Sequence, residues 1–171
     1  LSARGLFNLV NDITDFLKIK NNVIVLDKKA VDIRQVTKLV FDLYKPTISR
    51  KTLGLKNNIS AGTPLVYGDE GRIQQVIYTL MSNAIKNTDS GIVSINVEVI
   101  GEMLEIIITY TGKGILSDEP DRNLEPSAFE RSHFWNKYRI DGMSLSIVKY
   151  LVELHGGEFR YFTMLKLIPS I

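Results

Sequence analysis

The chain has 171 residues, 44% of them hydrophobic and 23% charged, which is typical of one folded domain or of one domain with a helical appendage. Its net charge of +2 is too small to indicate a nucleic-acid partner. The lack of cysteine excludes disulfides, thiolate nucleophiles and cysteine-bound zinc, and fits a reducing compartment. No apolar run approaches the ~18 residues that span a bilayer. We therefore expect a soluble, cytoplasmic piece of a longer protein, whose full length can still be membrane-anchored.

The first expected element is an amphipathic helix over residues 3–20. Its apolar stripe consists of Leu6, Val10, Ile13 and Leu17. An isolated helix of this kind needs a partner for its apolar face. It either docks on its own domain or forms half of a helical hairpin in a dimeric bundle. Because Asn21 and Asn22 end this helix, we divide the chain into a helical arm, 1–22, and a domain, 23–171.

The domain opens with a second expected helix. Asp32 precedes an apolar periodic segment, so it is the expected N-cap. Pro46 lies near the end of this helix, where it stops or kinks it. The residues that we expect to face inward are Val36, Leu39, Val40 and Leu43.

Residues 69–88 predict one helix with two different faces. Apolar residues at helical spacing form a face for the core: Ile73, Val76, Ile77, Leu80 and Ala84. A polar stripe lies beside that face: Arg72, Gln75, Thr79, Asn83 and Lys86. Because the stripe ends in a carboxamide and an amine, it is able to hold a metal–phosphate group. The alternative is a solvated helix face.

Three strands are expected between and after these helices. Residues 53–59 predict the first strand, which a turn at 62–64 follows. Apolar and polar residues alternate over 93–99, as in a half-buried strand. A turn at Gly101-Glu102 joins it to a strand over 104–109, which completes a hairpin.

The last part of the chain predicts a long loop and a helix. Residues 111–142 are rich in glycine, proline, aspartate and serine, and loops of this length inside compact domains are usually functional or disordered. The helix expected over 143–155 carries a stripe of Leu145, Val148, Val152 and His155. A strand-like run over 159–168 follows. The order of elements predicts an α+β layered fold.

Five segments, in this order, resemble parts of sensor histidine kinases. ARGLFNLVNDITDFLKI is similar to the second helix of their dimerisation and phosphotransfer hairpin. VYGDEGRIQQVIYTLMSNAIKNT resembles the N box, TGKGI the first glycine box, FERSHFW the F box, and GMSLSIVKYLVELHGGEF the second glycine box with its helix. The resemblance covers nearly the whole chain. It implies a two-layer α/β sandwich of the GHKL, or Bergerat, ATP-binding (HATPase) type, with an N-terminal helical arm and a lid loop over the nucleotide.

The resemblance implies ATP and Mg²⁺ as cofactors. Asn83 matches the metal-coordinating asparagine, and carboxamide oxygens suit Mg²⁺. Lys86 matches a lysine that neutralises phosphate charge. The other nucleotide-binding candidates lie at or beside the matched boxes: Asn87, Tyr110, Gly112, Gly114, Ile115, Gly142, Ser144 and Leu145.

Several positions depart from the family pattern. Tyr110 replaces the aspartate that accepts the adenine amino hydrogen, and Asn87 replaces an aromatic residue that packs on the base. Thr79 replaces an earlier asparagine, and the run 140–145 has lost two of its three glycines. One lost charge-assisted hydrogen bond costs roughly 1.5–3 kcal/mol, and lost stacking costs roughly 1–3 kcal/mol. We therefore expect nucleotide affinity to fall by about three decades.

Two functions follow from these observations. The first is the ATP-binding, catalytic domain of a two-component sensor histidine kinase, a transferase that passes the γ-phosphate to a histidine in a phosphorelay, here with impaired nucleotide binding. The alternative is a non-catalytic pseudokinase domain that acts as a dimerisation and signalling module. Another GHKL branch, such as an anti-sigma serine kinase or a chaperone-type ATPase, is disfavoured because those branches lack the hairpin helix.

The resemblance also implies where the phospho-accepting histidine lies and which partners the protein has. The phospho-accepting histidine of the family lies on the first bundle helix, upstream of residue 1, so we expect no catalytic residue in this chain. Neither His133 nor His155 occupies that position, and His155 is expected at a helix C-terminus. The implied partners are a second copy, joined through the arm, and a response regulator or phosphotransfer domain.

Overall fold

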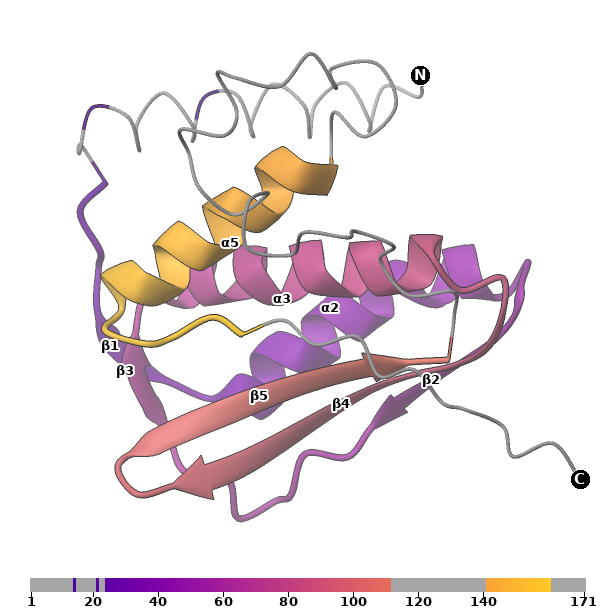
Figure 1. The fold of residues 1–171 in the computed structure, drawn as a ribbon. Helices are drawn as coiled ribbons and strands as arrows, with labels where there is room; N and C mark the ends of the chain where they lie inside the picture. Colours follow the sequence, from indigo (N-terminus) through magenta and orange to yellow (C-terminus); the bar gives the residue numbers. More distant parts are fainter. Residues whose placement is uncertain (1–13, 15–20, 22–23, 112–140, 161–171) are drawn as a thin grey trace, which may run out of the picture.

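A computed structural model describes residues 14, 21, 24–111 and 141–160 (Figure 1). Apart from the single positions 14 and 21, the expected arm lies outside the described residues, as do most of the expected lid loop and the strand-like run beyond residue 160. The elements in chain order are β1 Lys29–Val31, α2 Ile33–Ile48, β2 Thr52–Asn57, β3 Val66–Gly68, α3 Glu70–Lys86, β4 Ser90–Ile100, β5 Met103–Tyr110 and α5 Asp141–Leu154.

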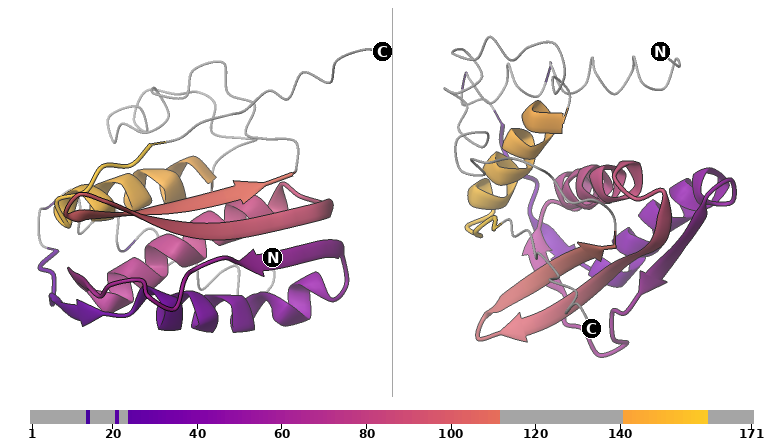
Figure 2. Two further views of the ribbon diagram at one scale, coloured as in Figure 1. Left: turned by 90° about the horizontal axis from the view of Figure 1, so that it is seen from below. Right: turned by 45° about the vertical axis from the view of Figure 1, so that its right-hand side comes forward.

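The described elements form a layer of helices on a sheet. In that sheet β4 lies between β2, to which it is parallel, and β5, to which it is antiparallel. Helices α2, α3 and α5 all lie on one side of this sheet (Figures 1 and 2). Helix α3 contacts α2, α5 and both strands of the β4–β5 hairpin. This arrangement confirms the predicted α+β sandwich.

The β4–β5 hairpin follows directly from the alternation of its residues. Its register runs from Val93 opposite Tyr110 to Ile100 opposite Met103, and the connecting turn contains Gly101 with a φ of 61°. Val93 and Ile95 are buried on the side of the core. At the turn, both strands extend one residue beyond the predicted limits because Ile100 pairs with Met103, and β4 begins three residues earlier than predicted because residues 90–92 pair with β2.

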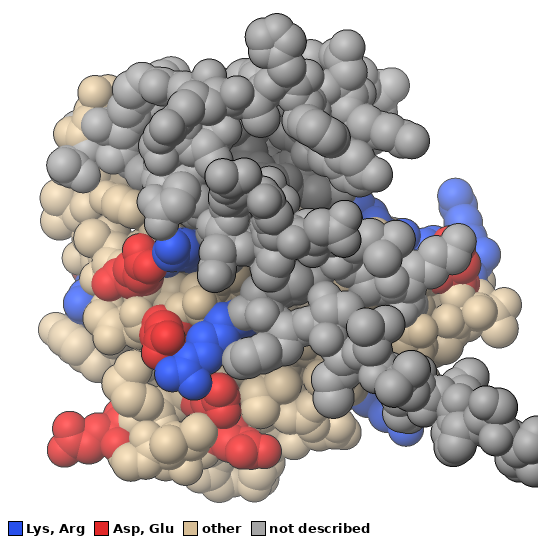
Figure 3. Space-filling view, in the orientation of Figure 1, with Lys and Arg blue, Asp and Glu red and all other residues tan. Residues whose placement is uncertain are grey.

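Acidic residues gather over the hairpin (Figure 3). Glu98 stands directly opposite Glu105, a like-charge pair that is unfavourable by itself. Arg160 bonds Glu158 at 2.7 Å, and the pKa of its guanidinium is raised by Glu158 first and by Glu105 as well. The charge of Glu105 therefore acts on a residue that follows α5 in the chain.

A second sheet was not predicted. Strands β1 and β3 pair antiparallel, with Lys29 opposite Gly68 and Val31 opposite Val66. Each strand has only three residues, which is too short to show an alternating pattern in the sequence. Because the strands are antiparallel and each leads into one helix, α2 and α3 start at opposite ends of the pair. The start of α3 therefore lies beside the start of β1, where Lys29 Nζ pairs with Glu70.

The apolar face of α2 differs from the predicted one. Asp32 caps the helix as expected, accepting a hydrogen bond from Arg34 N–H. However, Leu39 is 52% exposed and Leu43 is 43% exposed. The buried positions are Ile33, Val36, Thr37, Val40 and Tyr44. The prediction for the two leucines was wrong because it followed apolar residue type, whereas a threonine and a tyrosine complete the buried face.

The buried face of α3 is also wider than predicted. Its buried residues are Ile77, Met81, Asn83, Ala84 and Ile85. Ile73 and Val76 are only partly buried, and Val76 packs on a second cluster with Ile24, Ile147 and Leu151. The reason is that α3 is enclosed by α2, α5 and the sheet, so that residues well outside a single stripe lose contact with water.

The lysine that precedes β2 caps the end of α3. Lys51 Nζ donates to the carbonyl oxygens of Ile85 at 2.9 Å and Thr88 at 3.3 Å. The last carbonyls of a helix have no intrahelical partner, and a cation is favourable beside them. Lys51 therefore holds the end of α3 that carries Lys86 and Asn87.

Replacing Lys51 by methionine is expected to lower the free energy of unfolding by about 1–2 kcal/mol, because two carbonyls lose a charged donor. Urea denaturation followed by circular dichroism measures this. Lys56→Met is the matched control, since Lys56 is an exposed lysine on β2 and loses the same charge. Equal destabilisation by both substitutions would contradict the capping role.

Candidate functional site

The predicted metal ligand is buried. Asn83 lies near the C-terminal end of α3 and is 6% exposed, although the sequence predicted it in a polar stripe beside the core. Among the described residues its side-chain Nδ2 has no hydrogen-bond partner. A buried polar group without a partner costs roughly 1–3 kcal/mol. A carboxamide in this state is suited to a ligand that supplies the missing contact.

Lys86 and Asn87 follow on the last turn of α3 and behave differently from each other. Lys86 is exposed and lies one turn beyond Asn83. The side chain of Asn87 turns back, and its Nδ2 donates to the carbonyl oxygen of Asn83 at 2.8 Å. Asn87 thereby acts as the C-cap of α3. In the described structure its amide group is directed to this helix end.

The N-terminal half of the predicted polar stripe is occupied by an internal contact. Arg72 Nη1 donates to Gln75 Oε1 at 2.9 Å, one turn along α3. Such pairs stabilise a helix modestly. The polar stripe thus has an N-terminal half in which Arg72 and Gln75 bond each other, and a C-terminal half that contains the buried Asn83.

Tyr110 ends β5 and faces the core. It stands opposite Val93, and it packs against the main hydrophobic cluster together with Leu104, Ile106 and Ile108. These four residues alternate along β5, so they share the face of the sheet that the helices cover. A tyrosine ring, rather than a carboxylate, therefore enters the space between the sheet and the helices at the end of β5.

The remaining predicted ligands lie in or near the expected lid. Gly112, Gly114 and Ile115 are outside the described residues. Helix α5 begins at Asp141, two residues earlier than predicted, so that Gly142 and Ser144 belong to its first turn. The first N–H groups of a helix have no intrahelical acceptor and favour anions. The buried residues of α5 are Ile147, Val148 and Leu151, whereas Leu145 and Val152 of the predicted stripe are only partly buried.

Comparison with known proteins identifies the family. The model of the histidine kinase-, DNA gyrase B- and HSP90-like ATPases matches residues 68–167. The chain belongs to this family. Its relatives within this family include sensor histidine kinases. The chain is 32% identical over 158 residues to the sensor histidine kinase RcsC of Escherichia coli K12, and this match covers 92% of the chain but 17% of RcsC.

Solved structures of histidine kinases share the fold. Full-length ShkA, solved in complex with AMPPNP, is 27% identical with a TM-score of 0.74, and the match covers 89% of this chain and 31% of ShkA. ThkA, solved in complex with the response regulator protein TrrA, is 21% identical with a TM-score of 0.66, covering 90% of this chain and 42% of ThkA. The chain thus spans less than half the length of these relatives. None of the described helices of this ATPase domain is long and apolar enough to cross a membrane.

Sequence reasoning missed the role of Asp69. Its Oδ1 accepts a hydrogen bond from Arg72 N–H at 3.1 Å, which makes it the N-cap of α3, and its Oδ2 accepts one from Asp27 N–H at 3.0 Å. An aspartate directly before a periodic helical segment is a sequence signal for such a cap. The bond to Asp27 could not be found that way, because it joins segments that are far apart in the chain.

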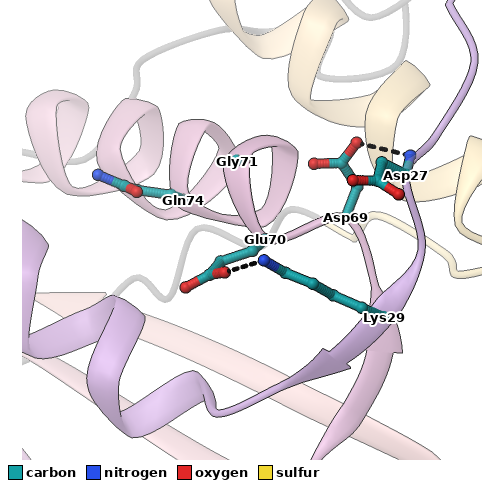
Figure 4. Close-up of a pocket in the computed structure, with 6 residues that line it drawn as sticks. All are labelled: Asp27, Lys29, Asp69, Glu70, Gly71 and Gln74. Carbon is teal, nitrogen blue, oxygen red and sulfur yellow. Dashed lines mark hydrogen bonds and ion pairs between the residues drawn. The ribbon is translucent and has the colours of Figure 1, made fainter.

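A shallow pocket of about 310 Å³ borders this N-terminus of α3. It is lined by Asp27, Lys29, Asp69, Glu70, Gly71 and Gln74 (Figure 4). Lys29 pairs with Glu70 at 2.6 Å across it. The pocket lies at the opposite end of α3 from Asn83, and the described residues contain no group of three His, Cys, Asp or Glu side chains that could hold a metal ion.

Asp69 makes stability depend on pH in the acidic range. Burial acts to raise the pKa of its carboxyl group, but hydrogen bonds from Arg72 and Asp27 N–H outweigh this and leave the pKa below its ordinary 3.8. A lowered pKa stabilises the fold above the unfolded value, and this contribution is lost as pH falls through the folded value.

The Asp69→Asn variant is therefore expected to lose less stability than the wild type as the pH falls below about 4. Asparagine retains an N-cap oxygen but has no carboxyl group to titrate. The midpoints of urea denaturation, measured from acidic to neutral pH, give the pH dependence of stability for the wild type and for the variant. Parallel loss of stability in the two proteins would show that Asp69 makes no contribution.

Proposed function

We propose that this chain binds a magnesium–nucleotide complex along the C-terminal half of α3, as part of a two-component histidine kinase, with affinity weakened at the adenine side. The observation that carries the proposal is the buried Asn83 amide, whose Nδ2 has no partner among the described residues. This residue occupies the position at which the sequence predicts the metal ligand. The relative ShkA has been solved in complex with AMPPNP, which supports a nucleotide as the ligand class.

Three groups would hold the phosphates. The Asn83 carboxamide can offer its oxygen, since rotation by 180° exchanges oxygen and nitrogen in nearly the same positions. Lys86, exposed one turn further, would offset negative charge. The first turn of α5, with Gly142 and Ser144, would contribute backbone N–H groups. When bound, Mg²⁺ supplies positive charge against the triphosphate.

The adenine side supports weaker binding. Tyr110 packs on the core at the end of β5, where the sequence predicts the base contact. Asn87 bonds the carbonyl of Asn83 and has no aromatic ring to stack on a base. The carboxylate acceptor and the stacking surface expected of this family are therefore both replaced. The same observations favour the second candidate function, a pseudokinase domain that contributes contacts but no chemistry.

The partners follow from the histidine kinases. ThkA has been solved in complex with the response regulator protein TrrA, and we propose a response regulator as a partner of the protein to which this domain belongs. We also propose that the arm, 1–22, joins two copies. We further propose that the phospho-accepting histidine lies in another segment of the protein, in line with the engagement of both ring nitrogens of His155 by backbone groups.

Isothermal titration calorimetry with ATP and ADP, each with and without Mg²⁺, tests the proposal. We expect weak binding that Mg²⁺ strengthens in the wild type, and loss of the Mg²⁺ effect in Asn83→Leu, which replaces the carboxamide by an apolar group of similar size. Asn58→Leu is the matched control, since Asn58 is exposed and its side-chain amide donates to the side chain of Asn96.

Three outcomes separate the candidates. Binding in the wild type with a Mg²⁺ effect that Asn83→Leu removes supports the proposed site. Low-micromolar binding would contradict the impaired adenine side. No heat, and no competition by ADP at millimolar nucleotide, would reject nucleotide binding and leave the pseudokinase function.

A further inference from the structure

The end of α5 is joined to the start of α3 by the ring of His155. Its Nε2 lies 3.0 Å from the backbone nitrogen of Asp69, and its Nδ1 lies 2.7 Å from the carbonyl oxygen of Leu151. The Asp69 N–H can only donate, so Nε2 must be the unprotonated acceptor. A carbonyl can only accept, so Nδ1 must carry the proton. The two contacts together require a neutral ring in one tautomer.

The backbone beside this contact is shaped to admit the ring. A Cβ added at Gly68 would lie 3.0 Å from His155 Cδ2 and 2.8 Å from Ile73 Cδ1. A methyl group at this position would push the flexible end of Ile73 aside and would make a tighter contact with the ring than almost all side chains make, so glycine lets the ring approach unobstructed. Asp69 and His155, which are 86 positions apart in the sequence, are thus brought into contact beside Gly68.

Asp69 extends the connection to a third segment. Its carboxylate caps α3 and accepts a hydrogen bond from Asp27 N–H, in the stretch that leads into β1. Beside it, Ile24 packs on Ile147 and Leu151 of α5. The stretch before β1, the start of α3 and the end of α5 are therefore held together by a small set of contacts around one backbone N–H.

We propose that His155 is a positioning residue for the nucleotide site. The N-terminal turn of α5 and the C-terminal half of α3 carry the groups proposed to hold phosphate, and the bond from Asp69 N–H to His155 ties the two helices at their other ends. This inference rests on the proposed function. It predicts that removing the acceptor on His155 weakens nucleotide binding without unfolding the domain.

Two substitutions of His155 distinguish the two hydrogen bonds that its ring makes. Glutamine places its side-chain oxygen as many bonds from the backbone as Nε2, so His155→Gln retains an acceptor for Asp69 N–H. Asparagine places its amide nitrogen as many bonds away as Nδ1, so His155→Asn retains only the donor to Leu151. Gly68→Ala is an independent variant, since its methyl group obstructs the ring while the histidine stays in place.

The test measures amide hydrogen exchange of Asp69 by NMR and the nucleotide dissociation constant of each folded variant by calorimetry. We expect His155→Asn and Gly68→Ala to speed Asp69 exchange and to weaken Mg–ATP binding by about tenfold each, while His155→Gln stays within about threefold of the wild type. Rescue by glutamine is the result that a merely structural role would not produce.

Other outcomes overturn the inference. Equal nucleotide affinity in His155→Asn and the wild type would reject the positioning role even if Asp69 exchange is faster. Unchanged Asp69 exchange in His155→Asn would reject the hydrogen bond itself. If the wild type binds no nucleotide, the proposed function fails and the positioning role fails with it, whereas Asp69 exchange still decides whether the bond joins the helices.

Discussion

Replacing Gly91 by alanine is expected to lower the free energy of unfolding by about 3 kcal/mol or more. Gly91 is the second residue of β4 and has a φ of 122°, a conformation that residues with a side chain rarely adopt. A Cβ added there would lie 2.0 Å from Thr111 Oγ1, far inside van der Waals contact. The substitution thus combines backbone strain with a clash that one of the two strands has to relieve.

Thr111 cannot move aside without cost. Its Oγ1 accepts a hydrogen bond from Ile92 N–H at 3.0 Å, and its own N–H donates to Ile92 O at 3.1 Å. These bonds close the open end of the β4–β5 hairpin, directly after Tyr110. We therefore expect the clash at Gly91 to disturb the end of β5, where the adenine side of the proposed site lies.

Chemical denaturation of three variants tests this explanation. Gly101→Ala is the matched control, because Gly101 also has a positive φ of 61° but a Cβ there meets nothing within 4 Å. It should cost about 1 kcal/mol. Adding Thr111→Ala to Gly91→Ala should recover part of the loss, since the two residues are in contact. Equal effects of Gly91→Ala and Gly101→Ala would mean that the clash is unimportant.

The second large effect is expected at the adenine side. Restoring a carboxylate by Tyr110→Asp, together with Asn87→Tyr for stacking and Ser144→Gly for backbone access, is expected to strengthen nucleotide binding by about 10- to 100-fold. The reason is that the aspartate supplies a charge-assisted acceptor, while removal of the Tyr110 ring opens space between the sheet and the helices. Calorimetry with Mg–ATP and Mg–ADP measures the change.

Stability has to be followed in the same variants. Tyr110 packs on the main core cluster, so its replacement by aspartate costs stability even if binding improves. Tyr67→Asp is the matched control, because Tyr67 is 74% exposed on β3 and the chemical change is identical. It should alter neither binding nor folding appreciably. An unchanged nucleotide affinity in the folded triple variant would show that the adenine side is closed by more than these three residues.

Local patterns in the sequence were sufficient to predict the longer helices and strands, and five motif-like segments indicated the family. Alternation over 93–99 and 104–109 predicted the hairpin, and periodicity over 69–88 predicted α3 within two residues at either end. These patterns are reliable because they repeat over several turns or residue pairs. The three-residue strands β1 and β3 carry too little repetition to be recognised.

Burial was decided by tertiary structure. The sequence predicted Asn83 as one member of a polar stripe. Because α2, α5 and the sheet enclose α3, the Asn83 side chain is instead buried, and its amide nitrogen has no partner among the described residues. Conversely, Leu39 and Leu43 read as core residues and are exposed. Periodicity gives the direction of a side chain around its own helix, whereas burial depends on how many other elements surround that helix.

By itself, the sequence determined the order of the longer helices and strands, the family resemblance, and the positions at which the nucleotide motifs are altered. Only the tertiary structure decided what the altered residues contact, with Tyr110 on the core and Asn87 on the end of α3. The hydrogen bond between the Asp69 backbone and His155 was likewise found only in the tertiary structure. The physical reason is that helix and strand patterns arise between neighbours in the chain, whereas these contacts form between segments that meet only after the helices pack on the sheet.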